Sequence, residues 1–221
     1  VHAAEYVTEL LGLDEVTLTG VFDTDGERAA AFGAEHGLRV LSSLADALAD
    51  NVRAIVVNTD TASPEAVISA ALRAGKHVFT EKVLAPRTDT ALALEQLARD
   101  QGRVLFVSLQ RLAEPWVYEM LDIVGSGAIG RVTASRLRYQ HGGVVEGWLP
   151  GTFLDPGEAC GGSIIDLGAH GYYLSQLFHG AFPDAVTATA SFFTGSAVED
   201  HSTVTLTYPG GVTSTLETSL V

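Results

Sequence analysis

Residues 54–82 read AIVVNTDTASPEAVISAALRAGKHVFTEK, in which two short apolar runs enclose one amphipathic segment. The apolar runs have the continuous character of strands buried on both faces of a sheet. Between them Ser63 is the expected N-cap of a helix, Pro64 takes its first position and Gly75 ends it. A strand, a helix and a second strand of these lengths predict a right-handed βαβ unit with a parallel sheet.

The same alternation continues on both sides of this unit. Before it, a strand at 16–22 is expected to lead into a helix with Thr24 as N-cap, Glu27 in a capping box and Gly37 at the end. A short strand at 39–41 and a short helix opening at Ser43 should follow, and after the unit a helix at 88–101 and a strand at 104–109.

The regular alternation of strands and helices ends at about residue 110. The expected elements there are a helix at 115–124, a strand at 132–139, a glycine-rich loop at 142–162, a helix at 163–179 and strands at 186–194, 201–208 and 212–219. Pro209-Gly210-Gly211 is typical of a hairpin between the last two strands. The predicted fold is therefore α/β: a Rossmann-type parallel-sheet domain over 1–110, followed over 111–221 by an α+β domain with a mainly antiparallel open sheet.

Charge and cysteine content narrow the class of protein. The 221 residues carry 27 acidic side chains against 13 Lys and Arg, a net charge of −14. Such a surface repels phosphate backbones and anionic lipid, so neither nucleic acid nor a membrane surface is an expected partner. No apolar run approaches the length of a membrane span, no signal peptide is recognisable, and Cys160 is the single cysteine. These features predict a cytoplasmic protein.

The two ends suggest a longer protein. The chain opens at Val1 without an initiator methionine, its sole methionine is Met120, and residues 212–221 read as an unfinished strand. We interpret both ends as cuts, with the first strand of the Rossmann-type domain lying before Val1.

Polar residues that directly follow strands are candidates for cofactor binding, because a parallel sheet binds ligands at the carboxyl ends of its strands. Asp23 could accept hydrogen bonds from the adenosine ribose and repel a 2′-phosphate, and Asp25 would reinforce that repulsion, so NAD is favoured over NADP. Helix initiation would explain Asp23 equally well. Asn58 and Thr59 lie at the same rim, where ordinary turn chemistry is the alternative.

Glu81 and Lys82 are a charged pair at the end of an apolar strand. Burying such a pair without a purpose would be costly, so both residues are candidates for cofactor binding, and the Lys82 ammonium is also a candidate for contact with a substrate hydroxyl or carbonyl. A surface ion pair is the competing interpretation.

Asp166 and His170 lie four residues apart on the predicted helix, which places them on one face, one turn apart. A carboxylate beside an imidazole can orient it and stabilise the imidazolium during acid–base catalysis. However, residues 163–166 also match a capping box, in which Asp166 would bond a backbone N–H and His170 would be an ordinary half-buried histidine.

Three further residues are weaker candidates. Arg111, at the predicted domain boundary, could reach cofactor or substrate, or form a salt bridge there. His141 and Trp148 flank the glycine-rich loop and could bind a sugar, or simply pack. No Cys/His spacing typical of zinc and no G-x-S-x-G motif is found, so no metal site is expected.

The motifs taken together resemble the Gfo/Idh/MocA oxidoreductases, the family of glucose–fructose oxidoreductase and inositol dehydrogenase. The resemblance rests on HAAEY at 2–6, the strand ending at Asp23, AGKHV at 74–78 with Glu81-Lys82, GAIG at 127–130 and GGSIIDLGAH at 161–170. It implies hydride transfer between a nicotinamide cofactor, NAD in preference to NADP, and a sugar or polyol.

The resemblance also implies residue roles and an assembly. Lys82 and His170 would act on the reacting oxygen, Asp166 would orient the substrate or the imidazole, and the C-terminal sheet would form a homo-oligomer. Val83 stands where the family has a proline, and Pro64 where many members have a histidine. Because of these departures, a second hypothesis is that the protein is a non-catalytic relative that binds a nucleotide or sugar. A further alternative is an enzyme that cleaves glycosides through bound NAD.

Overall fold

The computed structural model describes residues 2–221. It divides into two compact units: the first comprises residues up to Thr59 with Pro64–Glu81 and Arg87–Val107, and the second comprises Asp60–Ser63, Lys82–Pro86 and Ser108–Val221. The main change of unit falls at 107/108, near the expected boundary at 110/111. Two short segments before that point also group with the second unit, and one of them contains Lys82.

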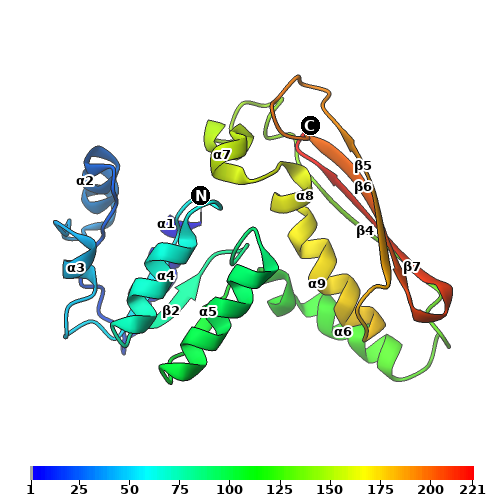
Figure 1. Ribbon diagram of the computed structural model, residues 1–221, viewed down its shortest axis with the longest axis horizontal. Coiled ribbons are helices and arrows are strands. Elements are labelled where there is room, and N and C mark those ends of the chain that lie inside the picture. The colour runs from blue at the N-terminus through cyan, green and yellow to red at the C-terminus, as the bar shows by residue number, and fades with distance from the viewer. Residues whose placement is uncertain (1) are drawn as a thin grey trace. The chain divides into compact units, whose positions relative to one another are not determined.

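The first unit is a parallel α/β structure (Figure 1). Its elements are α1 Ala3–Leu11, α2 Gly26–His36, α3 Leu44–Ala47, β1 Ala54–Val57, α4 Pro64–Arg73, β2 His77–Thr80, α5 Thr88–Asp100 and β3 Leu105–Val107. The strands pair in the order β1-β2-β3, both pairs parallel, with Val56 opposite Phe79 and Phe79 opposite Phe106. The predicted βαβ pattern is confirmed.

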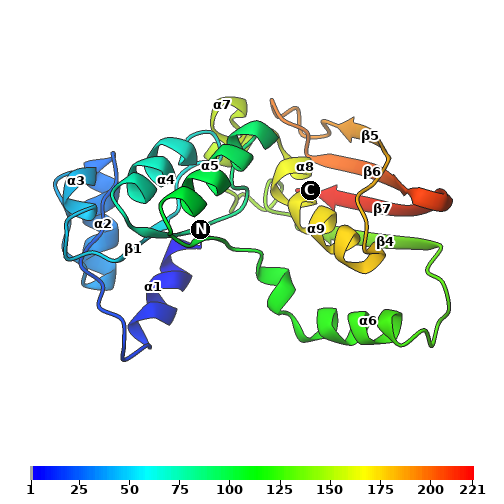
Figure 2. The same cartoon turned by 60° about the horizontal axis from the view of Figure 1, so that its bottom comes forward.

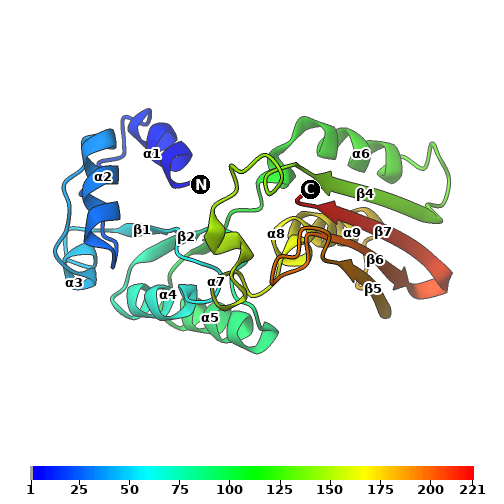
Figure 3. The same ribbon diagram turned by 90° about the horizontal axis from the view of Figure 1, so that it is seen from above.

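The two faces of this sheet are covered differently. Helices α4 and α5 lie on one face and α1 on the other (Figure 3). Side chains alternate along β2, so Val78 and Thr80 are each 2% exposed, while Phe79 points to the opposite face. There Tyr6 of α1 packs edge-on against Phe79, with ring centroids 4.9 Å apart, and Phe79 stacks on Phe106 at 5.4 Å.

The region before β1 differs from the sequence prediction. Instead of strands at 16–22 and 39–41, one isolated parallel bridge joins Val21 and Val40, because the neighbouring residues lack ladder partners. The N-cap of α2 is Asp25 rather than Thr24. The helix begins at Gly26, so the Asp25 carboxylate reaches the backbone N–H groups of Glu27 and Arg28, both at 3.0 Å.

The second unit combines helices with a four-stranded sheet, which can be followed in Figure 2. Its regular elements are α6 Pro115–Gly125, β4 Ala134–Gln140, α7 Pro156–Ala159, α8 Ser163–Asp166, α9 Gly168–His179, β5 Ala185–Ser191, β6 His201–Tyr208 and β7 Val212–Ser219, with short 3₁₀ turns at Gln110–Ala113, Gly151–Leu154 and Pro209–Gly211. The strand order is β4-β7-β6-β5. Only the β4–β7 pair is parallel, and β6 and β7 form the expected hairpin. The prediction of a mainly antiparallel sheet is confirmed.

Helices cover one face of this sheet. Val204, Leu206 and Leu216 form a buried cluster against which Ile164 and Tyr172 pack, so α8 and α9 bury the inward face. Along β6 and β7 the intervening residues are half-exposed, as expected for a sheet covered on one side. Within residues 2–221, no helix combines the length and apolar character needed to cross a membrane.

The helix predicted at 163–179 is divided in two. Its first part ends at Asp166 and its second begins at Gly168. At the junction the His170 N–H bonds the carbonyl of Leu167, three residues back, so the regular i→i−4 ladder is interrupted. The N-cap of the first part is Gly162, and Ser163 lies inside the helix, so the predicted capping box is wrong.

Candidate active site

Lys82 is held by Asp166 within the second unit. Its Nζ donates to the carbonyl oxygen of Asp166 at 2.7 Å and to Oδ1 of the same residue at 2.5 Å. The two side chains are only 11% and 17% exposed. Lys82 is therefore part of a largely shielded ion pair rather than a surface one, and Glu81 accepts a hydrogen bond from the Tyr6 hydroxyl. The ammonium group is oriented by two bonds and is largely shielded from solvent.

His170 lies near the start of α9 and is 6% exposed. Its Nδ1 is 2.8 Å from the Tyr173 hydroxyl, which also accepts the backbone N–H of Arg111 at 3.3 Å. The sequence predicted that Asp166 would lie beside the imidazole. In the structure the Asp166 carboxylate bonds Lys82, and the tyrosine one turn further along bonds His170.

Tyr173 is therefore a site residue that the sequence prediction missed. The spacing of three residues from His170 on a helix was the available signal, because side chains at that spacing lie on one face. A second tyrosine, Tyr139 of β4, packs against the imidazole with ring centroids 5.5 Å apart. Burial raises the pKa of the Tyr139 hydroxyl, with Arg111 acting in the opposite direction.

Arg111 lies in the 3₁₀ turn that precedes α6. It pairs with Glu114 at 2.8 Å, and its guanidinium carbon is 5.7 Å from the centroid of the Tyr139 ring. A hollow of about 310 Å³ beside β4 is lined by Arg111 and Tyr139, together with Trp116 and Arg138. The structure thus places Arg111 against the aromatic neighbour of His170, in the same unit.

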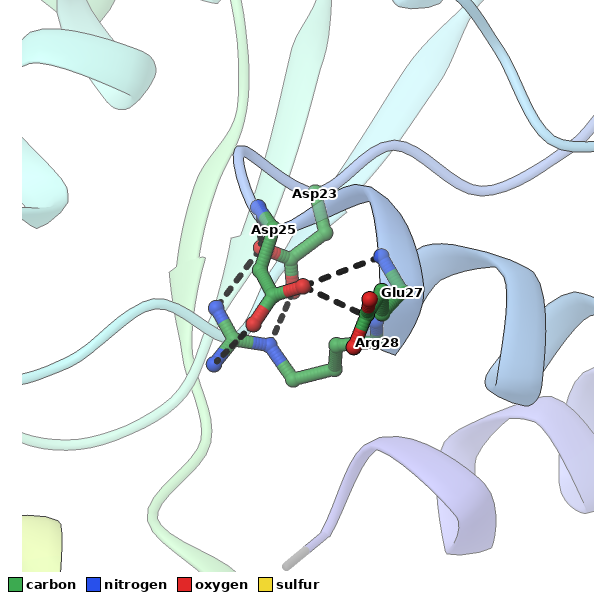
Figure 4. Close-up of polar contacts among 4 residues, drawn as sticks. All are labelled: Asp23, Asp25, Glu27 and Arg28. Carbon is green, nitrogen blue, oxygen red and sulfur yellow. Dashed lines mark hydrogen bonds and ion pairs between the residues drawn. The ribbon is translucent and has the colours of Figure 1, made fainter.

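Asp23 is bound by the arginine of the following helix, as Figure 4 shows. Arg28 donates from Nε and Nη2 to the two carboxylate oxygens of Asp23 at 2.6 and 2.7 Å, and Asp25 donates its backbone N–H at 2.9 Å. The hydrogen bond from Arg28 is the main reason that the pKa of Asp23 is lowered, with partial burial opposing it. The N-cap of the helix is Asp25, and Asp23 bonds the backbone N–H of that residue and the side chain of Arg28 in the first turn.

The remaining candidates are placed as follows. Asn58 and Thr59 directly follow β1, at the carboxyl end of the parallel sheet. His141 and Trp148 form a tilted ring pair with centroids 4.7 Å apart. The His141 Nδ1 accepts the N–H of Gly143 at 3.1 Å, while the Trp148 side chain stays 52% exposed. These two residues therefore pack on each other and leave much of the indole accessible.

No metal site is evident in the part of the chain that the structure describes. Residues 2–221 contain no group of three or more His, Cys, Asp or Glu side chains arranged to hold a metal ion.

Comparison with known proteins assigns both units to one family. Residues 2–109 match the family model described as oxidoreductase family, NAD-binding Rossmann fold, and residues 117–221 match the GFO/IDH/MocA C-terminal domain. The chain therefore belongs to the GFO/IDH/MocA family of oxidoreductases, as its motifs predicted.

Individual relatives include two curated enzymes and a solved structure. The chain is 31% identical to 1,5-anhydro-D-fructose reductase of Ensifer adhaerens, over 76% of this chain and 50% of that enzyme. It is 28% identical to an NADP⁺ scyllo-inositol 2-dehydrogenase of Bacillus subtilis, over 90% and 61%. The structure of GenD2 from gentamicin A biosynthesis, in complex with NAD, matches with a TM-score of 0.90 and 26% identity, over 97% and 62%. The chain thus spans between about half and two thirds of these relatives.

Proposed function

We propose that the protein transfers a hydride between NAD and a hydroxyl or carbonyl group of a sugar or polyol. The observation that carries this proposal is the Lys82 ammonium, held by Asp166 at 2.5 Å and shielded from solvent, with the buried His170 on the next helix. Membership of an oxidoreductase family, with relatives that include a sugar reductase and an inositol dehydrogenase, supports it.

Each of the four polar residues at the candidate site has a distinct role in this mechanism. His170 exchanges a proton with the reacting hydroxyl, while Lys82 donates a hydrogen bond to the same oxygen and stabilises its negative charge. Asp166 orients the ammonium group of Lys82 by accepting its hydrogen bonds. Tyr173, bonded to Nδ1, fixes the plane of the imidazole. NAD, when bound, supplies the carbon that accepts or returns the hydride.

The chemistry of Asp23 fits the adenosine end of a dinucleotide. A ribose diol donates hydrogen bonds, and Asp23 presents two acceptor oxygens whose direction Arg28 fixes at 2.6 and 2.7 Å. Asn58 and Thr59, which follow a parallel strand, and Arg111 are the further cofactor contacts that we propose. His141 and Trp148 are proposed to contact the substrate.

Spectroscopy of the native protein tests the proposed reaction. We expect NAD to be reduced when one member of a sugar and polyol panel is added, with the absorbance of the reduced nicotinamide as the readout. Tight NAD binding without reduction by any member of the panel would contradict the dehydrogenase proposal.

Removing the charge of Asp23 is expected to shift the cofactor preference toward NADP. Asp23→Asn keeps the side-chain shape but frees Arg28, whose guanidinium can then bind a 2′-phosphate. We expect the ratio of kcat/KM for NADP to that for NAD to rise about 100-fold, a change of about 2.7 kcal/mol. Steady-state kinetics with both cofactors measure it.

Two further variants separate the role of Arg28 from general charge effects. Arg28→Met in the Asp23→Asn background should remove most of the gain for NADP. Asp25→Asn also removes one negative charge, but it preserves the helix cap and the Asp23–Arg28 pair, so its shift should be much smaller. An equal shift in Asp25→Asn would show that net charge alone sets the preference.

We also propose that the protein is a cytoplasmic homo-oligomer that associates through the open face of the sheet formed by β4, β7, β6 and β5. Thr205 on β6, opposite Thr215 and Thr187 in the register, lies near the centre of this half-exposed face. Thr205→Arg is expected to convert the assembly to smaller species, measured by light scattering, because the introduced guanidinium groups of neighbouring copies would repel each other across the interface. Ala31→Arg, on the exposed surface of α2, is the control. An unchanged mass in Thr205→Arg would contradict this interface.

A further inference from the structure

Glu199 connects the loop before β6 to the start of α8. Its Oε1 accepts the backbone N–H groups of Gly162 at 3.0 Å and Ile164 at 2.9 Å. Its carbonyl oxygen accepts the N–H of Ser163 at 2.9 Å. Three successive donors at the beginning of α8 are thus satisfied by one residue more than thirty positions away, and the N-cap residue contributes no side-chain bond.

This connection is closely packed. A Cβ at Gly162 would overlap the Glu199 carbonyl oxygen, so only glycine allows the two backbones to approach this closely. Ser163 is fully buried, and its hydroxyl accepts a hydrogen bond from Thr218 at 2.9 Å, which in turn pairs with Ser202 at 2.6 Å. α8 is therefore anchored to β6 and β7 by side chains as well as by Glu199.

The loop that carries Glu199 is held by its neighbour. Asp200 is fully buried and accepts the N–H groups of Phe193 at 3.0 Å and Thr194 at 2.7 Å. Burial alone would raise the pKa of Asp200, but these bonds lower it. The Asp200 carbonyl also accepts the N–H of Leu220 at 2.8 Å. The side chain of Asp200 thus stabilises the loop, whereas that of Glu199 reaches α8.

The opposite end of α8 is Asp166, whose carbonyl and carboxylate both hold Lys82. A helix of four residues transmits any displacement of its first turn directly to its last residue. We propose that Glu199 is a positioning residue that, by fixing the start of α8, sets the place of Asp166 and through it the aim of Lys82. This inference rests on the proposed function, in which Lys82 acts on the reacting oxygen.

A matched pair of variants tests the inference in the native protein. Glu199→Gln keeps an acceptor oxygen at the same side-chain length, while Glu199→Met keeps the length but removes the acceptor; the backbone bond to Ser163 survives in both. We expect Glu199→Gln to retain kcat within about threefold and Glu199→Met to lose about 30-fold, since small misplacements of a catalytic group are costly. The Kd for NAD should change little in either variant.

Asp200→Asn is the control for loop stability. It should lower the melting temperature yet leave kcat near that of the unaltered protein, because its side chain does not reach α8. If Glu199→Met retained full activity, or if Asp200→Asn lost as much kcat as Glu199→Met for the same drop in melting temperature, the inference would be wrong. Should Glu199→Met fail to fold, Glu199→Asp, whose shorter side chain withdraws the acceptor, replaces it.

A second readout does not depend on turnover. Lys82 is 11% exposed and bonded to Asp166, so it should react slowly with an amine-acylating reagent. Mass spectrometry of the labelled protein should show about tenfold faster acylation of Lys82 in Glu199→Met than in Glu199→Gln. The reason is that a displaced Asp166 no longer holds and shields the Lys82 ammonium group. Equal rates would overturn the inference even if the unaltered protein proved inactive on every sugar, which would itself count only against the proposed function.

Discussion

Replacing His170 by alanine is expected to lower kcat by about a thousandfold, the size typical of losing a positioned acid–base group. The imidazole is 6% exposed and fixed by Tyr173 at 2.8 Å, so neither water nor a neighbouring side chain can easily take its place. Turnover of the best substrate with NAD measures the effect. Because alanine leaves a cavity of the shape of the missing ring, added imidazole should restore part of the lost rate.

The companion variant is Tyr173→Phe. It removes only the hydroxyl that orients Nδ1 and preserves the edge-on packing of the two rings, whose centroids are 5.8 Å apart. A loss of about tenfold is expected, because the proton-transferring group remains but its orientation is less restricted. A His170→Ala enzyme that kept more than a tenth of the normal rate would contradict the assigned role.

Replacing Lys82 by methionine is expected to lower kcat by about 10²- to 10³-fold, the usual result of removing one donor to a developing oxyanion. Methionine approximates the length of the aliphatic stem, so the main loss is the ammonium group and its two bonds to Asp166. Binding of NAD, followed by calorimetry, should weaken far less than turnover. A proportional loss of NAD affinity would instead place Lys82 in cofactor binding.

Lys76→Met is the matched control. Lys76 is 6% exposed and its Nζ donates to the carbonyl of Ala49 at 2.7 Å, so this variant also removes a buried ammonium group, but from the first unit. It should lower stability without a comparable change in kcat. Asp166→Asn combined with Lys82→Met should cost little more than Lys82→Met alone, because the two residues act as one unit.

Several parts of the fold were predictable because their signals are local. Proline at the first position of α4, glycine after α2 and α4, and the Pro-Gly-Gly turn between β6 and β7 each act through the backbone freedom of one or two residues. Apolar runs of strand length with intervening helices likewise specify a parallel sheet without reference to distant contacts.

The errors have a shared cause. Residues 16–22 have the composition of a strand, but a strand exists only where another segment supplies hydrogen bonds, and here only Val21 finds a partner, Val40. Residues 163–166 match a capping box, yet the N–H groups at that helix start are satisfied by Glu199. In both places a distant segment determined the outcome.

By itself, the sequence determined the order of most elements, the two sheet types and the candidates Lys82, Asp166 and His170, because propensities, turn chemistry and short motifs are properties of neighbouring residues. Only the tertiary structure decided the pairing: Asp166 with Lys82, His170 with Tyr173, Asp23 with Arg28 and the start of α8 with Glu199. A hydrogen bond depends on distance and direction in space. Residues such as Lys82 and Asp166, which are 84 positions apart, acquire these only when the chain has folded.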